Sequence, residues 1–214
     1  MKDKKVLVIG ATGLVGQQII FNLVNDTNVV EIVCLGRRSI RSTHTKLEYH
    51  KINFEKLLDY ESLFENVTDV ICSIGTTIKK AKSKEKFKFV DYEIPKMAAQ
   101  IAKAKGVNSF SLISSMGANF KSRVFYLQVK GEIEDVLKSF NFQRTLIYRP
   151  SLLLGKRLEY RFGEQLGGVF FKLFSWCVSV KYLQTDSAFL AKIIIENLYT
   201  QDFGVKVYES YMLR

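Results

Sequence analysis

The stretch KVLVIGATGLVG, residues 5–16, decides the fold of this chain. Its apolar residues 6–9 are too few for a helix and rich in β-branched side chains, which predicts a fully buried strand. Glycines follow at positions 10, 13 and 16, and from Leu14 onward apolar residues recur at helical spacing. Strand, glycine turn and helix in this order predict a pyrophosphate at the start of the helix, where backbone N–H groups are free. A plain corner between strand and helix is the alternative.

The glycines have separate tasks in this prediction. Gly10 permits a tight turn, Gly13 lets a ligand approach the backbone, and Gly16 lets the helix pack closely. Leu14 and Val15, the first residues of the helix, also belong to the predicted cofactor site because their N–H groups face it.

Length and composition indicate one domain with a sizeable core. The chain has 214 residues, 47% of them hydrophobic, and a net charge of +11. The basic residues concentrate at residues 37–51 and 79–88, and no nucleic-acid-binding motif is visible, so we expect no nucleic-acid partner.

The cysteines and the N-terminus bear on the cellular compartment. Cys34, Cys72 and Cys177 are odd in number and widely spaced, which favours reduced thiols over disulfides or a metal site. The opening MKDKK lacks the apolar stretch of a signal peptide. We therefore expect a cytoplasmic protein without a bound metal.

Strand and helix patterns alternate along the chain. After the first helix we expect strands at residues 29–35, 47–52, 67–73 and 109–114, a short helix at 57–64, a helix at 188–198 and a last strand at 205–212. This alternation predicts an α/β fold with a doubly wound, mostly parallel Rossmann-like sheet and helices on both faces. The whole chain would be one domain, with a cofactor-binding core at 1–155 and a small C-terminal substrate lobe at 156–214.

Two arginines follow the second strand. In dinucleotide-binding folds this position faces the adenosine ribose, where an acid selects NAD and arginine selects the 2′-phosphate of NADP. Here Arg37 and Arg38 stand in place of an acid, so we predict a preference for NADP(H) over NAD(H). A solvated basic loop is the alternative.

Later strand ends supply further candidates for cofactor contact. Asn53 follows the third strand and either meets the adenine or caps the turn. Gly75, Thr76 and Thr77 follow the fourth strand, where the glycine allows close approach and the threonines either bond ligand oxygens or cap a helix. Residues 77–88 carry six lysines and one glutamate, which favours a mobile or solvent-facing segment over a site.

The candidate catalytic residues follow the fifth strand. The strand ends in Ser114 and Ser115, and Tyr126 and Lys130 come after it at a spacing that places them on one helical face. A nearby ammonium stabilises a phenolate and can also hold ribose hydroxyls, while a serine hydroxyl can orient a carbonyl oxygen. We favour Ser115 over Ser114 because the second of two such serines usually faces the cofactor in similar enzymes. A surface Tyr–Lys pair is the alternative.

Several motifs together resemble the Tat-interacting oxidoreductase group of atypical short-chain dehydrogenases/reductases. They are the glycine turn, GRR after the second strand, CSIGTT, SLISSMGA, FYLQVKGEIE and YRPSLLLGKRLEYRFGE, and they cover nearly the whole chain. The resemblance implies an NADPH-binding protein whose phosphate turn includes Thr12. It also implies that Arg149 and Pro150 line the nicotinamide side of the site.

The last third contains a segment that is apolar on nearly all sides. Apolar residues recur at helical spacing within 163–180, and the roughly 12 apolar-rich residues, interrupted by Lys172, are too few to span a bilayer. We expect them to pack in the core, to form a homodimer interface or to make weak peripheral membrane contact, in that order.

Together these features favour an NADPH-dependent oxidoreductase that reduces a small carbonyl compound. The alternative is a non-catalytic NADPH-binding protein that regulates a protein partner.

Overall fold

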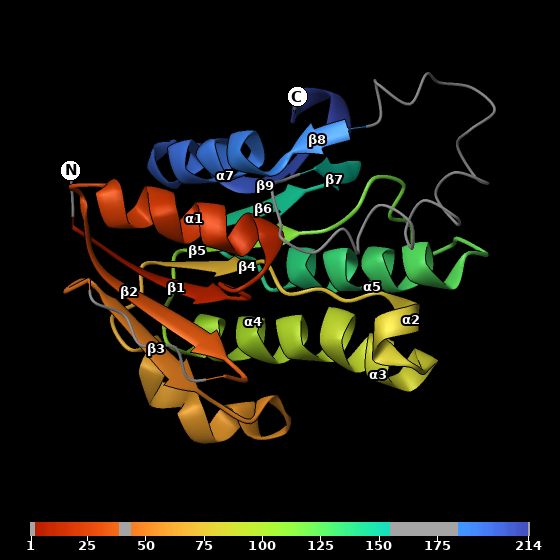
Figure 1. Ribbon diagram of the computed structural model, residues 1–214, viewed down its shortest axis with the longest axis horizontal. Coiled ribbons are helices and arrows are strands. Elements are labelled where there is room, and N and C mark those ends of the chain that lie inside the picture. Colours follow the sequence, from red (N-terminus) through yellow and green to blue (C-terminus); the bar gives the residue numbers. More distant parts are fainter. Residues whose placement is uncertain (1–2, 39–43, 155–183, 214) are drawn as a thin grey trace.

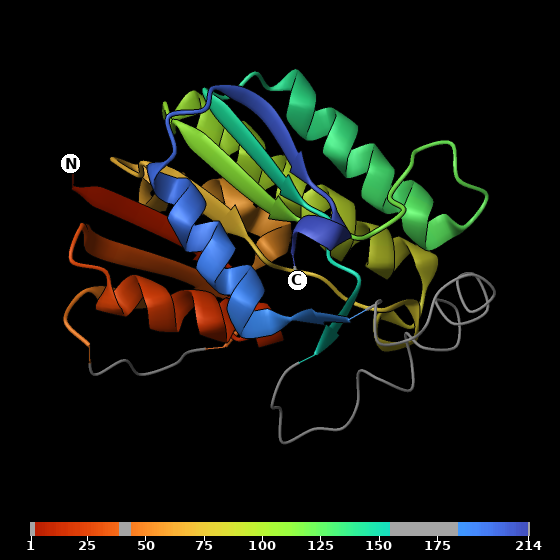
Figure 2. The same cartoon turned by 90° about the horizontal axis from the view of Figure 1, so that it is seen from above.

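The computed structural model describes residues 3–38, 44–154 and 184–213. Its centre is a seven-stranded sheet in the order β3-β2-β1-β4-β5-β6-β9, in which every neighbouring pair is parallel (Figures 1 and 2). The strands are β1 (Lys4–Ile9), β2 (Val29–Gly36), β3 (Leu47–Lys51), β4 (Asp69–Cys72), β5 (Ser109–Ile113), β6 (Arg144–Tyr148) and β9 (Gly204–Tyr208). The predicted doubly wound parallel fold is therefore confirmed.

Helices cover both faces of this sheet. Helices α1 (Leu14–Asn25) and α7 (Ser187–Glu196) lie on one face, and α4 (Ile94–Ala104) and α5 (Phe125–Ser139) lie on the other (Figure 1). The 3-10 segment η1 (Phe54–Phe64) packs beside α4. Because successive side chains of a strand point to opposite faces, β1 contributes to two apolar cores. Val6 and Val8 pack on the side of α1 and α7, and Leu7 and Ile9 on the side of α4 and α5.

The lysine-rich segment after β4 is folded. It forms two short helices, α2 (Ile78–Ala81) and α3 (Lys84–Lys88), whose starts are capped by the side chains of Thr77 and Ser83. Most of its lysines face solvent, as expected, but Phe87 is completely buried and anchors the segment. A π-helical turn, η2 (Phe89–Glu93), then leads into α4.

The C-terminal part differs in detail from the sequence prediction. The last strand ends at Tyr208, and a 3-10 turn, η5 (Ser210–Met212), replaces its expected final residues. A short 3-10 turn, η4 (Asn197–Tyr199), follows α7. Strands β7 (Leu152–Leu154) and β8 (Gln184–Asp186) form a separate parallel pair that the sequence did not indicate.

Three alternatives, core packing, a homodimer interface and peripheral membrane contact, were expected for the apolar segment 163–180. That segment, with Cys177, lies outside the described residues. Within the part that the structure describes, no helix is both long enough and apolar enough to cross a membrane.

Candidate functional site

A cavity of about 680 Å³ opens at the carboxyl ends of the parallel strands. Ligands of open α/β sheets bind at this edge, where loops from several strands meet. Fifteen of the candidate residues line it: Gly10, Thr12, Gly13, Leu14, Val15, Arg37, Arg38, Gly75, Thr76, Thr77, Ser114, Ser115, Tyr126, Lys130 and Pro150. Gly16, Asn53 and Arg149 do not.

The glycine turn leaves the start of α1 open toward the cavity. Gly10 has a φ of +92°, and a Cβ there would lie 2.7 Å from the backbone nitrogen of Ile74, so a side chain is excluded. A Cβ on Gly16 would lie 2.1 Å from the carbonyl oxygen of Gly10, which explains how closely α1 packs on the turn. No side chain caps the helix at Gly13. Its first N–H groups are thus suited to an anion.

Arg37 and Arg38 lie at the cavity rim next to this turn. Both are exposed, and both line the cavity after the end of β2. Among the described lining residues, the only carboxylate is Asp91, which lies after β4 in sequence. The β2 end of the cavity is therefore basic, as the sequence indicated.

The polar residues at the ends of β3 and β4 have structural partners. Asn53 is exposed, and its Oδ1 accepts the N–H of Glu55 at 3.0 Å, so it caps η1 and lies outside the cavity lining. The Thr77 hydroxyl accepts the N–H of Lys80 at 3.1 Å and caps α2, although Thr77 also lines the cavity. Of the two functions considered for each residue, the capping function is therefore present in both.

Tyr126 and Lys130 project from one helix, α5, toward the same cavity. The ammonium nitrogen of Lys130 lies 2.7 Å from Asp91 Oδ1, and both side chains are buried. The other oxygen of Asp91 accepts the N–H of Thr76 at 2.9 Å. Burial lowers the pKa of Lys130, but the nearby Asp91 and Tyr126 raise it, and the net effect is a pKa above the ordinary value for lysine. Lys130 is therefore held in place and charged at neutral pH.

The ring of Tyr126 is held from the side of α3. Its centroid lies 5.6 Å from that of the buried Phe87 ring, in a tilted arrangement. Such a contact restricts the orientation of the phenol.

The two serines have different partners. The Ser114 hydroxyl donates a hydrogen bond to Glu134, a buried carboxylate that also accepts from Arg149. The Ser115 hydroxyl makes only a long contact of 3.4 Å to the carbonyl oxygen of Met116. Arg149 lies outside the cavity lining because it is held between Glu134 and Glu209. Ser115 is thus better placed to bind a ligand.

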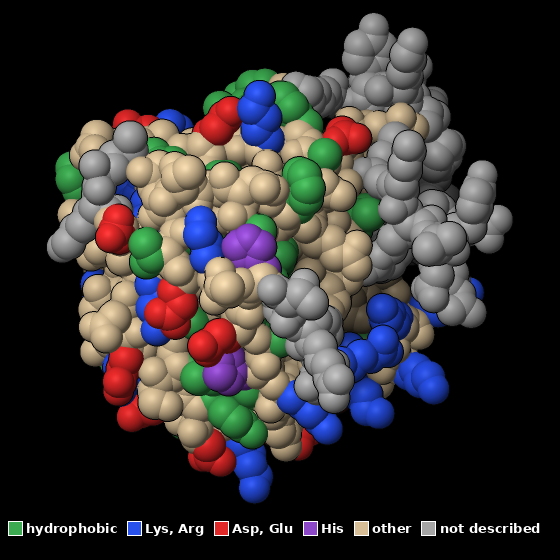
Figure 3. All heavy atoms as spheres, turned by 60° about the vertical axis from the view of Figure 1, so that its left-hand side comes forward, with side chains coloured by type: hydrophobic (Ala, Val, Ile, Leu, Met, Phe, Trp, Pro, Cys, Tyr) green, Lys and Arg blue, Asp and Glu red, His purple; other side chains and the backbone are tan. Residues whose placement is uncertain are grey.

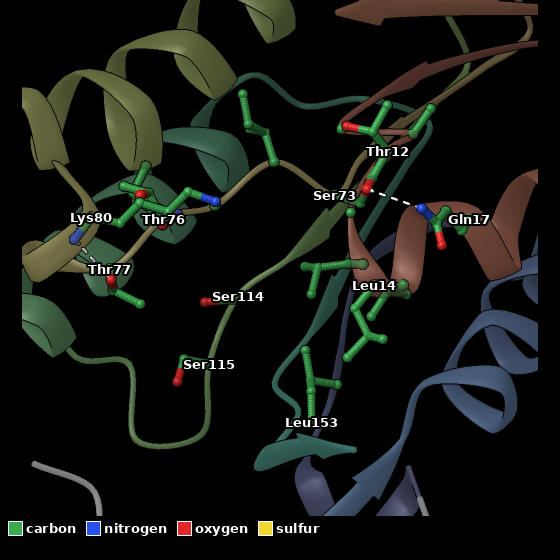
Figure 4. A pocket seen from close by; sticks show the side chains of 18 of the residues that line it. Thr12, Leu14, Gln17, Ser73, Thr76, Thr77, Lys80, Ser114, Ser115 and Leu153 are labelled. Carbon is green, nitrogen blue, oxygen red and sulfur yellow. Dashed lines mark hydrogen bonds between the residues drawn. The ribbon is translucent and has the colours of Figure 1, made fainter. Parts of the chain in front are cut away.

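The structure adds residues that the sequence analysis did not select. Asp91 and Lys80 line the cavity, as does Gln17 near Thr12 (Figure 4). Asp91 had no distinguishing feature in the sequence, since Glu85 and Glu93 lie in the same stretch. Lys80 had no distinguishing feature among the six lysines of its segment.

Comparisons with known proteins identify the family of this chain. A family model described as NAD(P)H-binding matches residues 10–170. Protein HTATIP2 of Rattus norvegicus is 34% identical over 80% of this chain and 72% of its own length. Protein FMP52-1, mitochondrial, of Scheffersomyces stipitis is 38% identical over 70% of this chain and 67% of its own length.

These relatives correct one expectation. The proteins from Scheffersomyces stipitis, Candida albicans and Lodderomyces elongisporus are named as mitochondrial, which contradicts the prediction of a cytoplasmic protein. The inference failed because the lack of an apolar signal peptide bears only on secretion. Mitochondrial targeting uses amphipathic rather than continuously apolar segments.

Solved structures share the fold at low sequence identity. The UDP-N-acetylglucosamine 4-epimerase of Methanobrevibacter ruminantium M1 superposes with a TM-score of 0.74 and 16% identity, over 98% of this chain and 77% of that chain. A short-chain dehydrogenase/reductase superfamily protein of Agrobacterium tumefaciens, with bound NAD, gives 0.73 and 14% identity, over 96% of this chain and 77% of that one. The family match, the relatives and the fold together show that this chain belongs to the NAD(P)H-binding family and, within it, to the Tat-interacting group of atypical short-chain dehydrogenases/reductases.

Proposed function

We propose that this protein is an NADPH-dependent reductase of a small carbonyl compound. The observation that carries the proposal is one continuous cavity that is lined both by the uncapped start of α1 and by Ser115, Tyr126 and Lys130. A dinucleotide bound at the helix start would extend toward these three side chains. No second cavity is needed to bring cofactor and substrate together.

The cofactor side fits a dinucleotide phosphate. The glycine turn offers backbone N–H groups to the pyrophosphate, and Arg37 and Arg38 offer guanidinium groups to a 2′-phosphate. No carboxylate among the described lining residues lies at the end of β2, where an acid would hold the ribose hydroxyls of NAD. These features support NADP(H) over NAD(H).

The chemistry follows from the three side chains at the other end. A bound nicotinamide cofactor supplies the hydride. Ser115 orients the carbonyl oxygen of the substrate, and Tyr126 donates its phenolic proton to that oxygen. Lys130 holds its positive charge beside Tyr126 and so stabilises the phenolate that remains. Asp91 keeps the ammonium in position.

A panel of small aldehydes and ketones tests the proposal. Wild-type protein should oxidise NADPH with at least one member, and Tyr126→Phe should lower kcat by at least about 100-fold, as expected for the loss of a general acid. NADPH affinity should stay within about twofold, because the phenol hydroxyl is not needed for the phosphate contacts. Tyr211→Phe, at a side chain that is 71% exposed, is the matched control and should keep full activity.

The same experiment separates the proposal from the regulatory alternative. If NADPH binds but no compound is turned over in a Tyr126-dependent way, the reductase proposal is wrong. A search for a partner whose affinity changes with NADPH would then be the next step.

The names of the yeast relatives suggest mitochondria as the compartment. Microscopy or fractionation of the tagged full-length protein would test this assignment directly.

A further inference from the structure

The side chains that line the cavity carry an excess of positive charge. Among the lining residues that the structure describes, four are cations, Arg37, Arg38, Lys80 and Lys130, and one is a carboxylate, Asp91. Asp91 forms its ion pair with Lys130. The net charge of this described part of the lining, four minus one, is therefore +3, and it corresponds to Arg37, Arg38 and Lys80.

These three cations lie on opposite sides of β1. The strand order β3-β2-β1-β4-β5 places Arg37 and Arg38, which follow β2, on one side and Lys80, which follows β4, on the other. In Figure 4, Lys80 lies across the cavity from Thr12 and Gln17, which follow β1. The arginines thus belong to the cofactor end, and Lys80 belongs to the end where β5 brings Ser115.

Lys80 lies on helix α2, and the following helix, α3, packs against α5, which carries Tyr126 and Lys130. Helix α2 begins at the Thr77 cap, and α3 follows it at the Ser83 cap. Phe87 of α3 packs against Phe125 and Tyr126 of α5, with ring centroids 5.7 and 5.6 Å apart. The position of Lys80 relative to Tyr126 is therefore set by folded structure.

The surroundings reinforce the charge of Lys80. The α2–α3 segment also contains Lys79, Lys82, Lys84, Lys86 and Lys88, against a single acid, Glu85. On the face drawn in Figure 3, Lys and Arg side chains gather at the lower right, whereas Asp and Glu lie mostly elsewhere. A cleft bordered by one sign of charge raises the local concentration of ligands of the opposite sign.

We propose that the substrate is an oxo acid, a small compound with a carboxylate in addition to its carbonyl group, and that Lys80 binds the carboxylate. One lysine with uncharged hydroxyl neighbours, Thr76 and Thr77, balances a single negative charge. The reacting carbonyl then lies at Ser115 and Tyr126. This inference rests on the proposed reductase function and specifies its substrate class.

The test uses ω-oxo carboxylates of about two to six carbons, a range that suits a cavity of this size, and their methyl esters, with NADPH. Wild-type protein should reduce at least one acid with a higher kcat/KM than its ester. Lys80→Gln should lower kcat/KM for that acid about tenfold, which corresponds to ~1.4 kcal/mol, and leave the ester within about twofold. The preference for the acid should shrink as the salt concentration rises from about 20 to 300 mM.

Lys79→Gln is the matched control. Lys79 is exposed on the same helix and does not line the cavity. This variant removes one positive charge from the same helix, so it should change both kcat/KM values by less than about twofold. NADPH affinity should be equal in the wild type and in both variants.

Three results would overturn the inference while leaving the reductase function intact. They are equal kcat/KM for acids and esters in the wild type, an equal loss for both in Lys80→Gln, and weaker NADPH binding in Lys80→Gln. The last result would assign Lys80 to the cofactor phosphates.

If no compound is turned over, the proposed reductase function is wrong, and the carboxylate site at Lys80 is tested by binding measurements alone. Titration calorimetry on NADPH-loaded protein then compares the same acids and esters. Binding of an acid that is lost in Lys80→Gln and kept in Lys79→Gln supports the site, and any other result overturns it.

Discussion

The ammonium nitrogen of Lys130 lies 2.7 Å from Asp91 Oδ1, where the two side chains are only 6% and 0% exposed. Asp91 belongs to the π-helical turn Phe89–Glu93, and its second oxygen accepts the N–H of Thr76. One carboxylate thus joins the turn after β4 to the helix that carries Tyr126. In the proposed mechanism Asp91 is a positioning residue, since it acts through Lys130.

Replacing Asp91 with asparagine should lower the free energy of unfolding by about 3–5 kcal/mol at neutral pH, because a buried ammonium is left without its counter-charge. In the wild type, the raised pKa of Lys130 contributes stability that is fully present below about pH 10.4 and lost as pH rises through the folded-state pKa. In Asp91→Asn, burial of Lys130 acts without the carboxylate and lowers that pKa below its unfolded value. The unfolding free energy of the variant should therefore rise with pH. Urea unfolding between about pH 7 and pH 10 should show that the difference in unfolding free energy between wild type and variant becomes smaller.

The control is Asp135→Asn, which disrupts a half-exposed pair with Lys138 on the same helix. It should cost less than about 0.5 kcal/mol at every pH. If Asp91→Asn loses the same amount of unfolding free energy at all pH values, the loss comes from altered packing and not from the unpaired ammonium charge.

Alanine substitutions of the two neighbouring serines should have different effects, one on activity and the other on stability. Ser115→Ala should lower kcat/KM about 100-fold with less than about 1 kcal/mol change in unfolding free energy, because its hydroxyl makes only a weak contact within the protein. Ser114→Ala should instead cost about 1–3 kcal/mol of stability, because buried Glu134 loses a donor. Steady-state kinetics and urea unfolding of both variants check the assignment. The opposite pattern would transfer the catalytic role to Ser114.

The arginine pair should determine cofactor selectivity. Arg37→Ala combined with Arg38→Ala should weaken NADPH binding at least about tenfold and change NADH binding less than about twofold, because only NADPH has the 2′-phosphate. Fluorescence titration of both cofactors measures this. Lys51→Ala with Lys56→Ala removes two exposed cations that do not line the cavity and should change neither affinity. Equal affinity of the wild type for both cofactors, unchanged in the arginine variant, would refute the assignment.

Among the glycines of the turn, Gly16 leaves the least space for a Cβ atom. A Cβ there would lie 2.1 Å from the carbonyl oxygen of Gly10, so Gly16→Ala must push α1 away from the turn. We expect a stability loss of about 2 kcal/mol or more from this overpacking, together with weaker NADPH binding. Gln18→Ala, two residues further along the same helix, should leave stability within about 0.5 kcal/mol. Thermal unfolding and cofactor titration of both variants test this, and normal values for Gly16→Ala would contradict the packing argument.

From the sequence alone we could predict the order of strands β1 to β5, the glycine turn and the helical face shared by Tyr126 and Lys130. These features depend on neighbours within a few residues, through hydrophobic period and glycine placement. The sequence also indicated which residues would meet at one edge of the sheet, because parallel strands all end there. The same local patterns could not predict the π-helical turn before α4 or the β7–β8 pair.

The folded structure set the partners of the candidate residues. It paired Lys130 with Asp91, tied Ser114 to Glu134 while leaving Ser115 with one weak contact, and held Arg149 outside the cavity lining. It also selected Lys80 from six similar lysines. Each of these outcomes depends on contacts between segments that are distant in the chain, and the distances and burial of such contacts are set by packing of the whole fold rather than by spacing along the sequence.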